Sequence, residues 1–227
     1  MQKILFGIFA HPDDEAFGPV AALLDEVEKG TELHLITQTG GENGTNPDNL
    51  ENLGEVRLQE WKAAGKLIGA TSLHHFGYTD GTLNNLNHRE IAERLQMLVR
   101  EIVANRNDIE IEFMSLDLNG YTGHIDHIVA SRSALLAFYR LREEGLSMAR
   151  VRLACLSREE MPTIQTGFVY GEQGRTPDEI DETVDGSRFT DKIHKIMQQH
   201  HTQRVDYETV TSYKGDALGI NYFIVLD

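Results

Sequence analysis

The chain has 227 residues and an apolar content of 40%, which is enough to bury the core of one compact domain. Its formal charge of -15, from 36 acidic and 21 basic residues, repels phosphate backbones and anionic membrane surfaces, so we expect no nucleic-acid partner. The opening MQKILFGIFA is too short for a membrane span. A single cysteine, Cys155, cannot form an internal disulfide and favours a reducing, cytoplasmic location.

Segments typical of strands and helices alternate along the chain. We expect strands at residues 4–9, 33–37, 72–76, 109–116 and 151–156, and helices at residues 17–29, 53–68, 88–105 and 125–144. Strands separated by helices of this length imply a Rossmann-like α/β fold, with a mostly parallel sheet and helices on both faces. Residues 217–226 are a further expected strand, for which antiparallel pairing is an option. We expect a single domain over residues 1–227.

Residues 157–188 fit neither pattern. They include REEMP and GEQGRTPDEIDE and contain few apolar side chains. Two interpretations stay open for this span, a lid over a substrate site and a solvated loop.

The sequence HPDDE directly follows the first expected strand, at residues 11–15. Proline and acidic side chains are favoured in the first turn of a helix, so this motif can simply start one. That interpretation leaves His11 unexplained, because a cap residue at this place would more usefully be serine or aspartate. The other interpretation is a metal or acid–base site, since ligands bind beyond the carboxyl ends of the strands in such sheets.

The sequence TGHIDH at residues 122–127 also follows an apolar strand and begins a helix, so it can reach the same edge of a parallel sheet. Two imidazoles and one carboxylate with an open fourth position form a hydrolytic zinc site, and His11, Asp14 and His127 can supply these groups. The same donors accept Fe(II), because metal availability often decides occupancy. The alternative is a helix capped by Asp126 with two incidental histidines.

The two motifs together resemble the LmbE-like, or PIG-L, family of zinc-dependent N-acetylglucosaminyl deacetylases. Further matches lie in TQTGGE at residues 37–42, RLQE at residues 57–60 and GYTDG at residues 77–81, and a weaker one lies in HHTQ at residues 200–203. The resemblance implies an LmbE-like fold and a zinc-dependent hydrolase that removes the N-acetyl group from an N-acetylglucosamine-type sugar or its conjugate. A small N-acetylated amino sugar is then the expected partner.

The resemblance also implies roles for the residues of the two motifs. His11, Asp14 and His127 match the metal ligands. Asp13 matches the general base that takes a proton from the metal-bound water, and we expect the metal and the helix amino end to favour its charged form. His124 lies three residues before a ligand, where it could as an imidazolium stabilise the developing oxyanion or protonate the leaving amine.

Three residues outside the ligand set have expected roles. By resemblance, Arg57 and Asp80 match positions that bind the sugar or a neighbouring hydroxyl. Alternatively, Arg57 is a surface residue that pairs with Glu55 or Glu60. Asp126 is either an outer partner of a metal-binding histidine or a helix cap.

Two departures from the family pattern limit the transfer of roles. Ile125 stands where the family often has proline, and Thr122 stands where some members have an active-site tyrosine, with Tyr121 one step earlier. The sequence leaves open whether Tyr121 reaches the site, and the same holds for His200 in the weak C-terminal match.

Two other functions stay open. A metallohydrolase on the same scaffold can act on another N-acyl substrate, and a non-catalytic binding protein can keep the fold and the metal. A dinucleotide-binding enzyme is disfavoured, because no G-x-G-x-x-G follows the first strand. The sequence identifies neither the rest of the substrate nor the oligomeric state, a homo-oligomer included.

Overall fold

The computed structural model describes residues 1–159 and 174–227. In these ranges, strands form one sheet in the order β3-β2-β1-β4-β5-β7-β6. The strands are β1 (Gln2–Phe9), β2 (Glu32–Thr39), β3 (Ser72–Tyr78), β4 (Ile109–Leu116), β5 (Met148–Cys155), β6 (Glu182–Asp185) and β7 (Ile220–Leu226). The helices are α1 (Asp14–Phe17), α2 (Val20–Glu28), α3 (Leu53–Ile68), α4 (His88–Val103), α5 (Ile125–Glu143), α6 (Thr190–Met197) and α7 (Arg204–Lys214).

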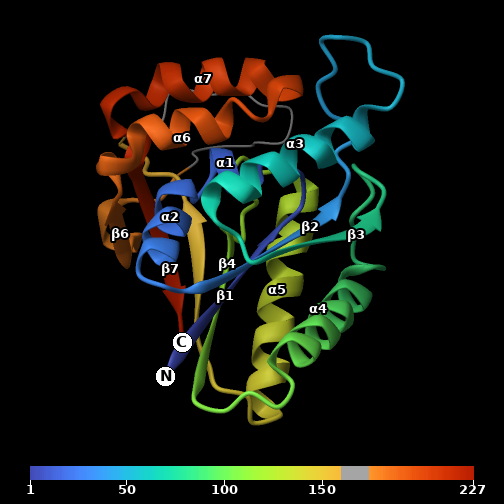
Figure 1. Ribbon diagram of the computed structural model, residues 1–227, viewed down its shortest axis with the longest axis vertical. Coiled ribbons are helices and arrows are strands. Elements are labelled where there is room, and N and C mark those ends of the chain that lie inside the picture. Colours follow the sequence, from blue (N-terminus) through green and yellow to red (C-terminus); the bar gives the residue numbers. More distant parts are fainter. Residues whose placement is uncertain (160–173) are drawn as a thin grey trace.

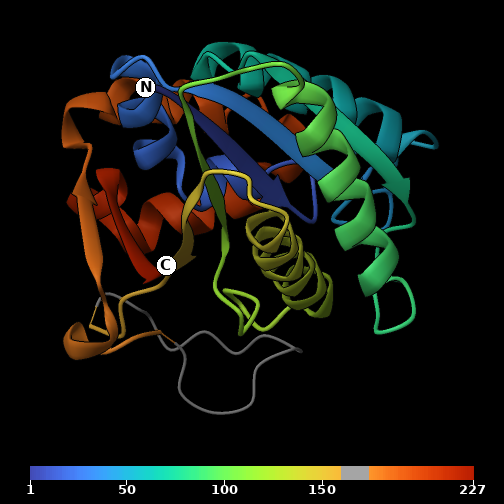
Figure 2. The same cartoon turned by 90° about the horizontal axis from the view of Figure 1, so that it is seen from below.

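Strands β1 to β5 run parallel, and helices cover both faces of the sheet (Figure 1, Figure 2). Helices α4 and α5 pack on one face, and α2, α3 and α6 pack on the other. Strand β1 is buried from Ile4 to Phe9 because it lies in the middle of this covered sheet, which explains its continuous apolar sequence. The predicted Rossmann-like α/β architecture is confirmed.

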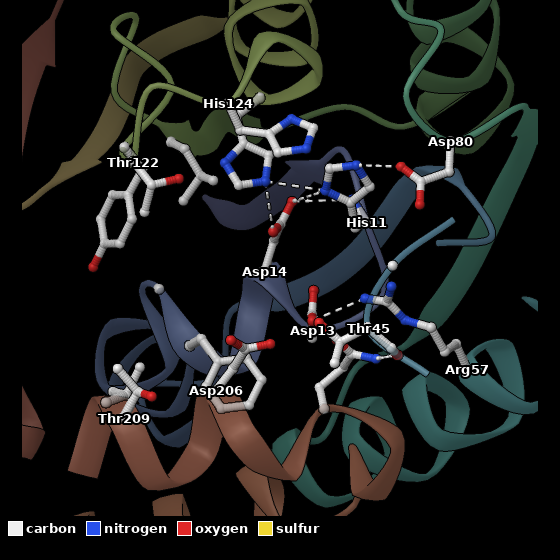
Figure 3. Close-up of a pocket in the computed structure, with 18 of the residues that line it drawn as sticks. His11, Asp13, Asp14, Thr45, Arg57, Asp80, Thr122, His124, Asp206 and Thr209 are labelled. Carbon is white, nitrogen blue, oxygen red and sulfur yellow. Dashed lines mark hydrogen bonds and ion pairs between the residues drawn. The ribbon is translucent and has the colours of Figure 1, made fainter. Parts of the chain in front are cut away.

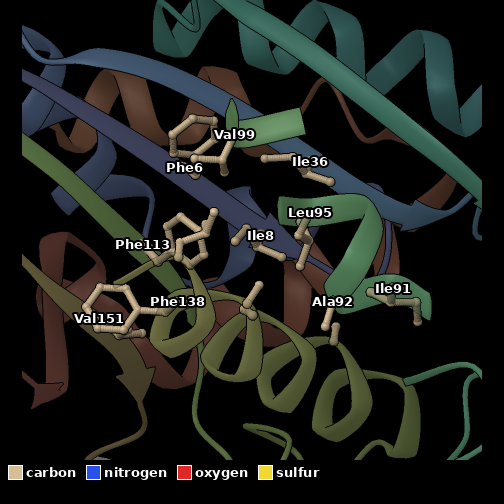
Figure 4. Close-up of a cluster of buried hydrophobic side chains, with 14 of the residues drawn as sticks. Phe6, Ile8, Ile36, Ile91, Ala92, Leu95, Val99, Phe113, Phe138 and Val151 are labelled. Atoms are coloured by element: carbon tan, nitrogen blue, oxygen red, sulfur yellow. The ribbon is translucent and has the colours of Figure 1, made fainter. Parts of the chain in front are cut away.

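One apolar core lies between the sheet and helices α4 and α5 (Figure 4). Phe113 of β4 packs edge-to-face against Phe6 of β1 at a centroid distance of 5.7 Å and against Phe138 of α5 at 5.8 Å. Such aromatic pairs stabilise a fold by about 0.5–1.5 kcal/mol beyond the burial of their area. This packing fixes α5, and therefore TGHIDH at its start, relative to β1 and β4.

The helix expected at residues 17–29 is two helices, α1 and α2. Pro19 has no N–H to donate to the preceding turn, so the helix is interrupted at Gly18 and Pro19. Asn221 of β7 supports the interruption, because its side chain accepts a hydrogen bond from Ala22 N at 3.0 Å and donates one to Gly18 O at 3.2 Å. The HPDDE motif therefore leads into its own short helical turn at the end of β1.

The C-terminal part holds three elements that the sequence patterns did not reveal: β6, α6 and α7. Strand β7 pairs antiparallel with β5, which confirms the antiparallel option for residues 217–226. In the unassigned span, residues 160–173 lie outside the described residues, while residues 182–185 form strand β6 at the edge of the sheet beside β7. No helix in the described ranges combines the length and the apolar character that a membrane crossing requires.

The order of the parallel strands changes direction at β1, with β2 and β3 on one side and β4 and β5 on the other. In α/β sheets of this kind, ligands bind in the crevice beyond the carboxyl ends of the strands at such a point. HPDDE follows β1 and TGHIDH follows β4, so the fold brings both motifs to this crevice.

Candidate metal centre and active site

A cavity of about 530 Å³ lies beyond the carboxyl ends of β1 and β4 (Figure 3). HPDDE contributes to its base, and its walls come from the loops after β2, β3 and β4 and from the C-terminal segment that includes α7. Besides those of HPDDE, the polar lining residues are Asn43, Thr45, Arg57, Asp80, Tyr121, Thr122, His124, His127, Gln203, Asp206, Thr209 and Tyr213. The cavity therefore joins the two motifs to a helix from the far end of the chain.

The three predicted metal ligands converge in this cavity. His11 Nδ1 lies 3.0 Å from His127 Nε2, and Asp14 Oδ1 lies 3.1 Å from the same nitrogen. Asp14 Oδ2 is 3.8 Å from His11 Nδ1 and accepts hydrogen bonds from the N–H groups of Ala10 and His11, each at 3.0 Å. These bonds hold Asp14 against the end of β1 with its other oxygen beside His127.

The contacts of the two histidines suit metal binding. His127 Nδ1 lies 3.0 Å from Gly120 O and therefore carries the proton, which leaves a lone pair on Nε2. His11 Nε2 faces Asp80 Oδ1 at 3.0 Å and Asp126 Oδ2 at 3.5 Å, so the proton belongs there and the lone pair is on Nδ1. Two lone pairs 3.0 Å apart repel each other unless they share a cation. The donor set therefore fits zinc or a similar divalent ion.

The surrounding charges also favour a cation. Burial lowers the pKa of His11, but the carboxylates of Asp126, Asp14 and Asp80 outweigh burial and raise this pKa well above its usual value. Burial raises the pKa of Asp14, but His127 and His11 hold it well below its usual range. A cage that stabilises a proton on His11 also stabilises a metal ion in the place of that proton.

Two other sets of three side chains in the described ranges are close enough to share an ion: His11, His124 and His127, and His11, Asp80 and Asp126. In the first set, His124 Nδ1 already accepts a hydrogen bond from Asp126 N at 3.1 Å. In the second set, both oxygens of Asp126 already accept backbone hydrogen bonds, from Gly81 N at 2.8 Å and from Leu83 N at 3.1 Å. The predicted set with Asp14 leaves all these contacts in place.

Asp80 and Asp126 both lie beside His11. Asp80 places Oδ1 near His11 and accepts a hydrogen bond from Asn43 N through Oδ2 at 3.0 Å, so both of its oxygens have neighbours. Neither carboxylate has in-line hydrogen-bond geometry with His11 Nε2, so the attraction is electrostatic. The predicted helix-cap alternative for Asp126 is wrong, because the side chain of His124 caps α5. Asp80, predicted to bind sugar, contacts a proposed metal ligand.

Asp13 enters the cavity from a strained backbone. Its φ of 130° and ψ of -24° lie in a region that is unfavourable for a residue with a Cβ atom. Its carbonyl accepts hydrogen bonds from Ala16 N and Phe17 N at 2.8 and 2.9 Å, which starts α1, but its side chain makes no capping bond. The carboxylate instead accepts a hydrogen bond from Arg57 Nη2 at 2.8 Å. Asp13 is therefore more than a helix cap.

Arg57 is buried, with 3% of its surface exposed, which excludes the predicted alternative of a surface residue paired with Glu55 or Glu60. Besides Asp13, its guanidinium donates to the carbonyls of Gly41 and Pro12, each at 2.8 Å. Arg57 also lines the cavity. Arg57 thus contacts the proposed base Asp13 directly. Its role in sugar binding stays a prediction.

Burial raises the pKa of Asp13 to about 6, although the charge of Arg57 opposes this rise. The helix amino end therefore does not outweigh burial, because the cost of burying the charge exceeds the attraction of Arg57, while the expected effect of the metal on Asp13 stays a prediction. A general base works well when its pKa lies near the working pH, so this shift suits the predicted role.

His124 differs from its predicted imidazolium form. Burial lowers its pKa to about 4, and the neighbouring rings of His127 and His11 lower it further than the nearby carboxylates raise it. The ring stacks on His127 at a centroid distance of 4.8 Å. Because Nδ1 accepts a hydrogen bond from Asp126 N, neutral His124 carries its proton on Nε2 and can donate it in a hydrogen bond.

The sequence predicts no catalytic or binding role for Glu15 and leaves the role of His200 open. Both are fully buried, with His200 Nε2 at 2.9 Å from Glu15 Oε1, and Glu15 follows the lining residue Asp14 in the chain. The only signals in the sequence were the last letter of HPDDE and the weak HHTQ match. Tyr121 does line the cavity. Glu42 accepts a hydrogen bond from Asp80 N at 3.0 Å and so supports the loop after β3.

The sheet order and the histidine and aspartate residues at its edge define an LmbE-like α/β protein. The sequence model of the PIG-L family, GlcNAc-PI de-N-acetylase, matches residues 6–138, which is more than half of the chain. The chain therefore belongs to the PIG-L family, a family of metal-dependent N-deacetylases. Among its relatives is 1D-myo-inositol 2-acetamido-2-deoxy-alpha-D-glucopyranoside deacetylase of Salinispora arenicola, which is 26% identical over 95% of this chain and 82% of the relative.

Solved structures share the fold. N,N'-diacetylchitobiose deacetylase from Pyrococcus horikoshii superposes with a TM-score of 0.69 at 18% identity, over 99% of this chain and 84% of the other. The zinc-inhibited form of teicoplanin deacetylase Orf2 gives 0.61 at 12% identity, over 99% and 98%. The 4-carboxy-2-hydroxymuconate hydratase GalB from Pseudomonas putida gives 0.63 at 17% identity, over 100% and 97%. Because the last protein is a hydratase, the shared fold does not by itself fix the reaction.

Proposed function

We propose that this protein is a zinc-dependent N-deacetylase that releases acetate from an N-acetylglucosamine-type sugar or its conjugate. One observation carries the proposal: a cavity of about 530 Å³ holds the predicted base Asp13 together with His11, Asp14 and His127, which converge to within 3.8 Å. His124 lines the same cavity. A base, a complete ligand set and a hydrogen-bond donor are the groups that hydrolysis of an amide needs.

His11, Asp14 and His127 would hold the divalent ion, which would activate a water molecule and polarise the amide carbonyl. Asp13 then takes the proton of the attacking water, with its carboxylate held by Arg57 at 2.8 Å. His124, neutral and protonated on Nε2, donates a hydrogen bond to the carbonyl oxygen on which negative charge develops. Asp13 then donates this proton to the leaving amine. The same carboxyl group therefore acts first as the general base and then as the general acid.

The charges of the cavity favour a substrate without a phosphate near the acetamido group. Among the described lining residues, Arg57 is the only lysine or arginine, and its guanidinium is held by Asp13, Gly41 and Pro12. Residues 160–173 contain no lysine or arginine in their sequence. Asp206 and Thr209 of α7 line the part of the cavity away from the metal ligands (Figure 3). We therefore propose a neutral or cationic sugar conjugate as the substrate.

Metal content and acetate release, measured on the same zinc-loaded protein, test the proposal. The substrates are N-acetylglucosamine, N,N'-diacetylchitobiose and N-propionylglucosamine. The first two differ in the sugar, and the first and third differ in the acyl group, so the assay tests specificity for each part separately. We expect acetate from the wild type, retained zinc and a loss of turnover of about 10²–10⁴-fold in Asp13→Asn, and loss of zinc in His127→Ala. Zinc binding without acetate release from any acetylated sugar would contradict the proposal and favour another acyl substrate or a binding role.

His124→Ala decides between the two possible functions of this histidine. We expect this variant to keep its zinc and to lose turnover, since a hydrogen bond to the developing oxyanion is made only in the transition state. Loss of zinc would instead support the ligand set of three histidines. Iron(II) loading in parallel tests the metal preference, which the donor set leaves open.

The cytoplasmic location, the single domain and a possible homo-oligomer stay predictions.

A further inference from the structure

The HHTQ segment at residues 200–203 attaches the C-terminal part of the chain to the first half. Thr202 donates to Glu60 through N at 3.0 Å and through Oγ1 at 2.6 Å, and Gln203 Nε2 donates to Thr45 O at 2.9 Å. His200 contacts Glu15, which is 185 positions earlier in the chain. Of these three attachments, only the one made by His200 leads to HPDDE.

Glu15 connects His200 to Asp13. One of its carboxylate oxygens, Oε1, lies 2.9 Å from His200 Nε2, and the other, Oε2, accepts a hydrogen bond from Asp13 N at 3.2 Å. Both side chains of the His200–Glu15 pair have no exposed surface. The other ring nitrogen of His200, Nδ1, has no hydrogen-bond partner in the described part of the chain, so Glu15 is the polar contact that fixes this ring.

Asp13 needs such a contact because its backbone is strained. With φ at 130°, Asp13 holds a conformation that a residue with a Cβ atom rarely adopts. Strained residues persist only where the surrounding structure holds them in place. The side chain of Asp13 is held by Arg57 and its carbonyl by the first turn of α1. Within residues 1–159 and 174–227, the acceptor for its N–H is Glu15.

We propose that Glu15 and His200 are positioning residues for the reaction. Glu15 holds the strained Asp13 backbone through the Asp13 N–H, and His200 from the C-terminal segment fixes the Glu15 carboxylate. This pair directs the Asp13 carboxylate into the cavity beside the metal ligands. The inference rests on the proposed function, in which Asp13 is the base, and it gives the C-terminal HHTQ segment a part in catalysis beyond attachment.

Variants of Glu15 test the contact directly. Glu15→Ala removes the acceptor for the Asp13 N–H, and we expect kcat to fall by about 10–100-fold with KM and zinc content little changed, because misplacing a reacting group by about 1 Å has an effect of this size. Glu15→Gln keeps an acceptor oxygen of the same reach and should restore most of the lost kcat. Crystal structures of the wild type and Glu15→Ala should show a changed φ at Asp13.

His200→Ala is the second disrupting variant, and it serves if Glu15→Ala does not fold. The space that the imidazole leaves admits water to Glu15, so the protein should still fold. The Glu15 carboxylate loses its fixed position, however, so we expect a lower kcat with little change in KM. Thr202→Val is the matched control, because Thr202 belongs to the same segment and contacts Glu60 but not HPDDE. We expect Thr202→Val to lower the melting temperature and to leave kcat unchanged.

The outcomes separate this inference from the proposed function. An unchanged Asp13 backbone in Glu15→Ala, a wild-type kcat in both disrupting variants, or an equal loss of kcat in Thr202→Val would overturn the positioning role. Absence of acetate release from the wild type would overturn the proposed function instead. In that case the crystal structures still decide whether Glu15 holds the Asp13 backbone.

Discussion

Arg57 Nη2 lies 2.8 Å from Asp13 Oδ2 and 2.8 Å from Pro12 O, so one guanidinium holds both the carboxylate of the proposed base and the backbone that precedes it. This contact places Arg57 next to the reacting groups and gives it an electrostatic effect on Asp13. It also distinguishes two roles for Arg57 that the sequence could not separate, sugar binding and control of the base.

Arg57→Gln should shift the pH dependence of the reaction. Burial raises the pKa of Asp13 to about 6 and Arg57 opposes this rise, so removing the cation raises the pKa further. Because the base must be ionised, the acidic limb of kcat/KM should move to higher pH, measured from about pH 5 to about pH 9. Arg57→Lys is the control that keeps the charge, and its limb should stay near that of the wild type. A higher KM in Arg57→Gln with no shifted limb would favour sugar binding.

Asp80→Asn should weaken zinc binding rather than substrate binding. Asp80 Oδ1 lies 3.0 Å from His11 Nε2, and a carboxylate beside a ligating histidine orients the ring and strengthens it as a ligand. We expect the zinc affinity to fall by about 10–100-fold in competition with a chromogenic chelator, with KM unchanged at saturating zinc. Glu42→Gln is the control, since Glu42 contacts the Asp80 backbone but not His11. An unchanged zinc affinity with a higher KM would return Asp80 to its predicted role in sugar binding.

The cavity should discriminate against anionic substrates. Asp206 lines its outer part and repels a phosphate there, while Arg57 is held by Asp13. At low ionic strength, kcat/KM should be about 10-fold higher for a methyl glycoside of N-acetylglucosamine than for N-acetylglucosamine 1-phosphate, and salt should narrow this difference. Asp206→Asn should narrow it as well. Asp191→Asn, which removes one charge from α6 outside the cavity, should not. Equal kcat/KM values for both substrates would contradict the proposed neutral or cationic conjugate.

The sequence predicted those parts of the site that lie within short motifs at the ends of strands. His11 and Asp14 lie within five residues of the end of β1, and His127 lies in the first turn of α5, which follows β4. Parallel strands bring the segments that follow them to one edge of the sheet. Most of the helices and strands were predicted from their apolar patterns, because these patterns reflect burial on the two faces of one sheet.

The remaining features depend on tertiary packing and could not be predicted. The pKa of Asp13 depends on how deeply the folded chain buries it, and the low pKa of His124 depends first on burial and then on the rings of His127 and His11. Helix α7 and strand β6 are short or polar and gave weak patterns. The partner of Glu15 lies 185 positions away, so its contact follows only from the docking of the C-terminal segment.

The His200–Glu15 pair should make stability depend on pH with a defined sign. Burial lowers the pKa of His200, but the charge of Glu15 outweighs burial and the pKa ends above the usual 6.5. The imidazolium is thus favoured in the folded state, so its contribution to stability is complete below pH 6.5 and is lost as the pH rises through the higher folded-state pKa. Within that window the free energy of unfolding should decrease by up to about 1.4 kcal/mol per pH unit from this group.

Urea unfolding of the wild type and His200→Gln at constant free zinc measures this effect. Glutamine can donate to Glu15 but does not titrate, so the difference in unfolding free energy between the two proteins should shrink as the pH rises above 6.5. Both proteins contain the same metal ligands, so the pH dependence of metal binding cancels in the difference. Thr202→Val should differ from the wild type by an amount that does not vary with pH, because its contact with Glu60 involves no histidine. A His200→Gln difference that stays constant with pH would show that His200 is neutral in the folded protein and holds Glu15 through an ordinary hydrogen bond.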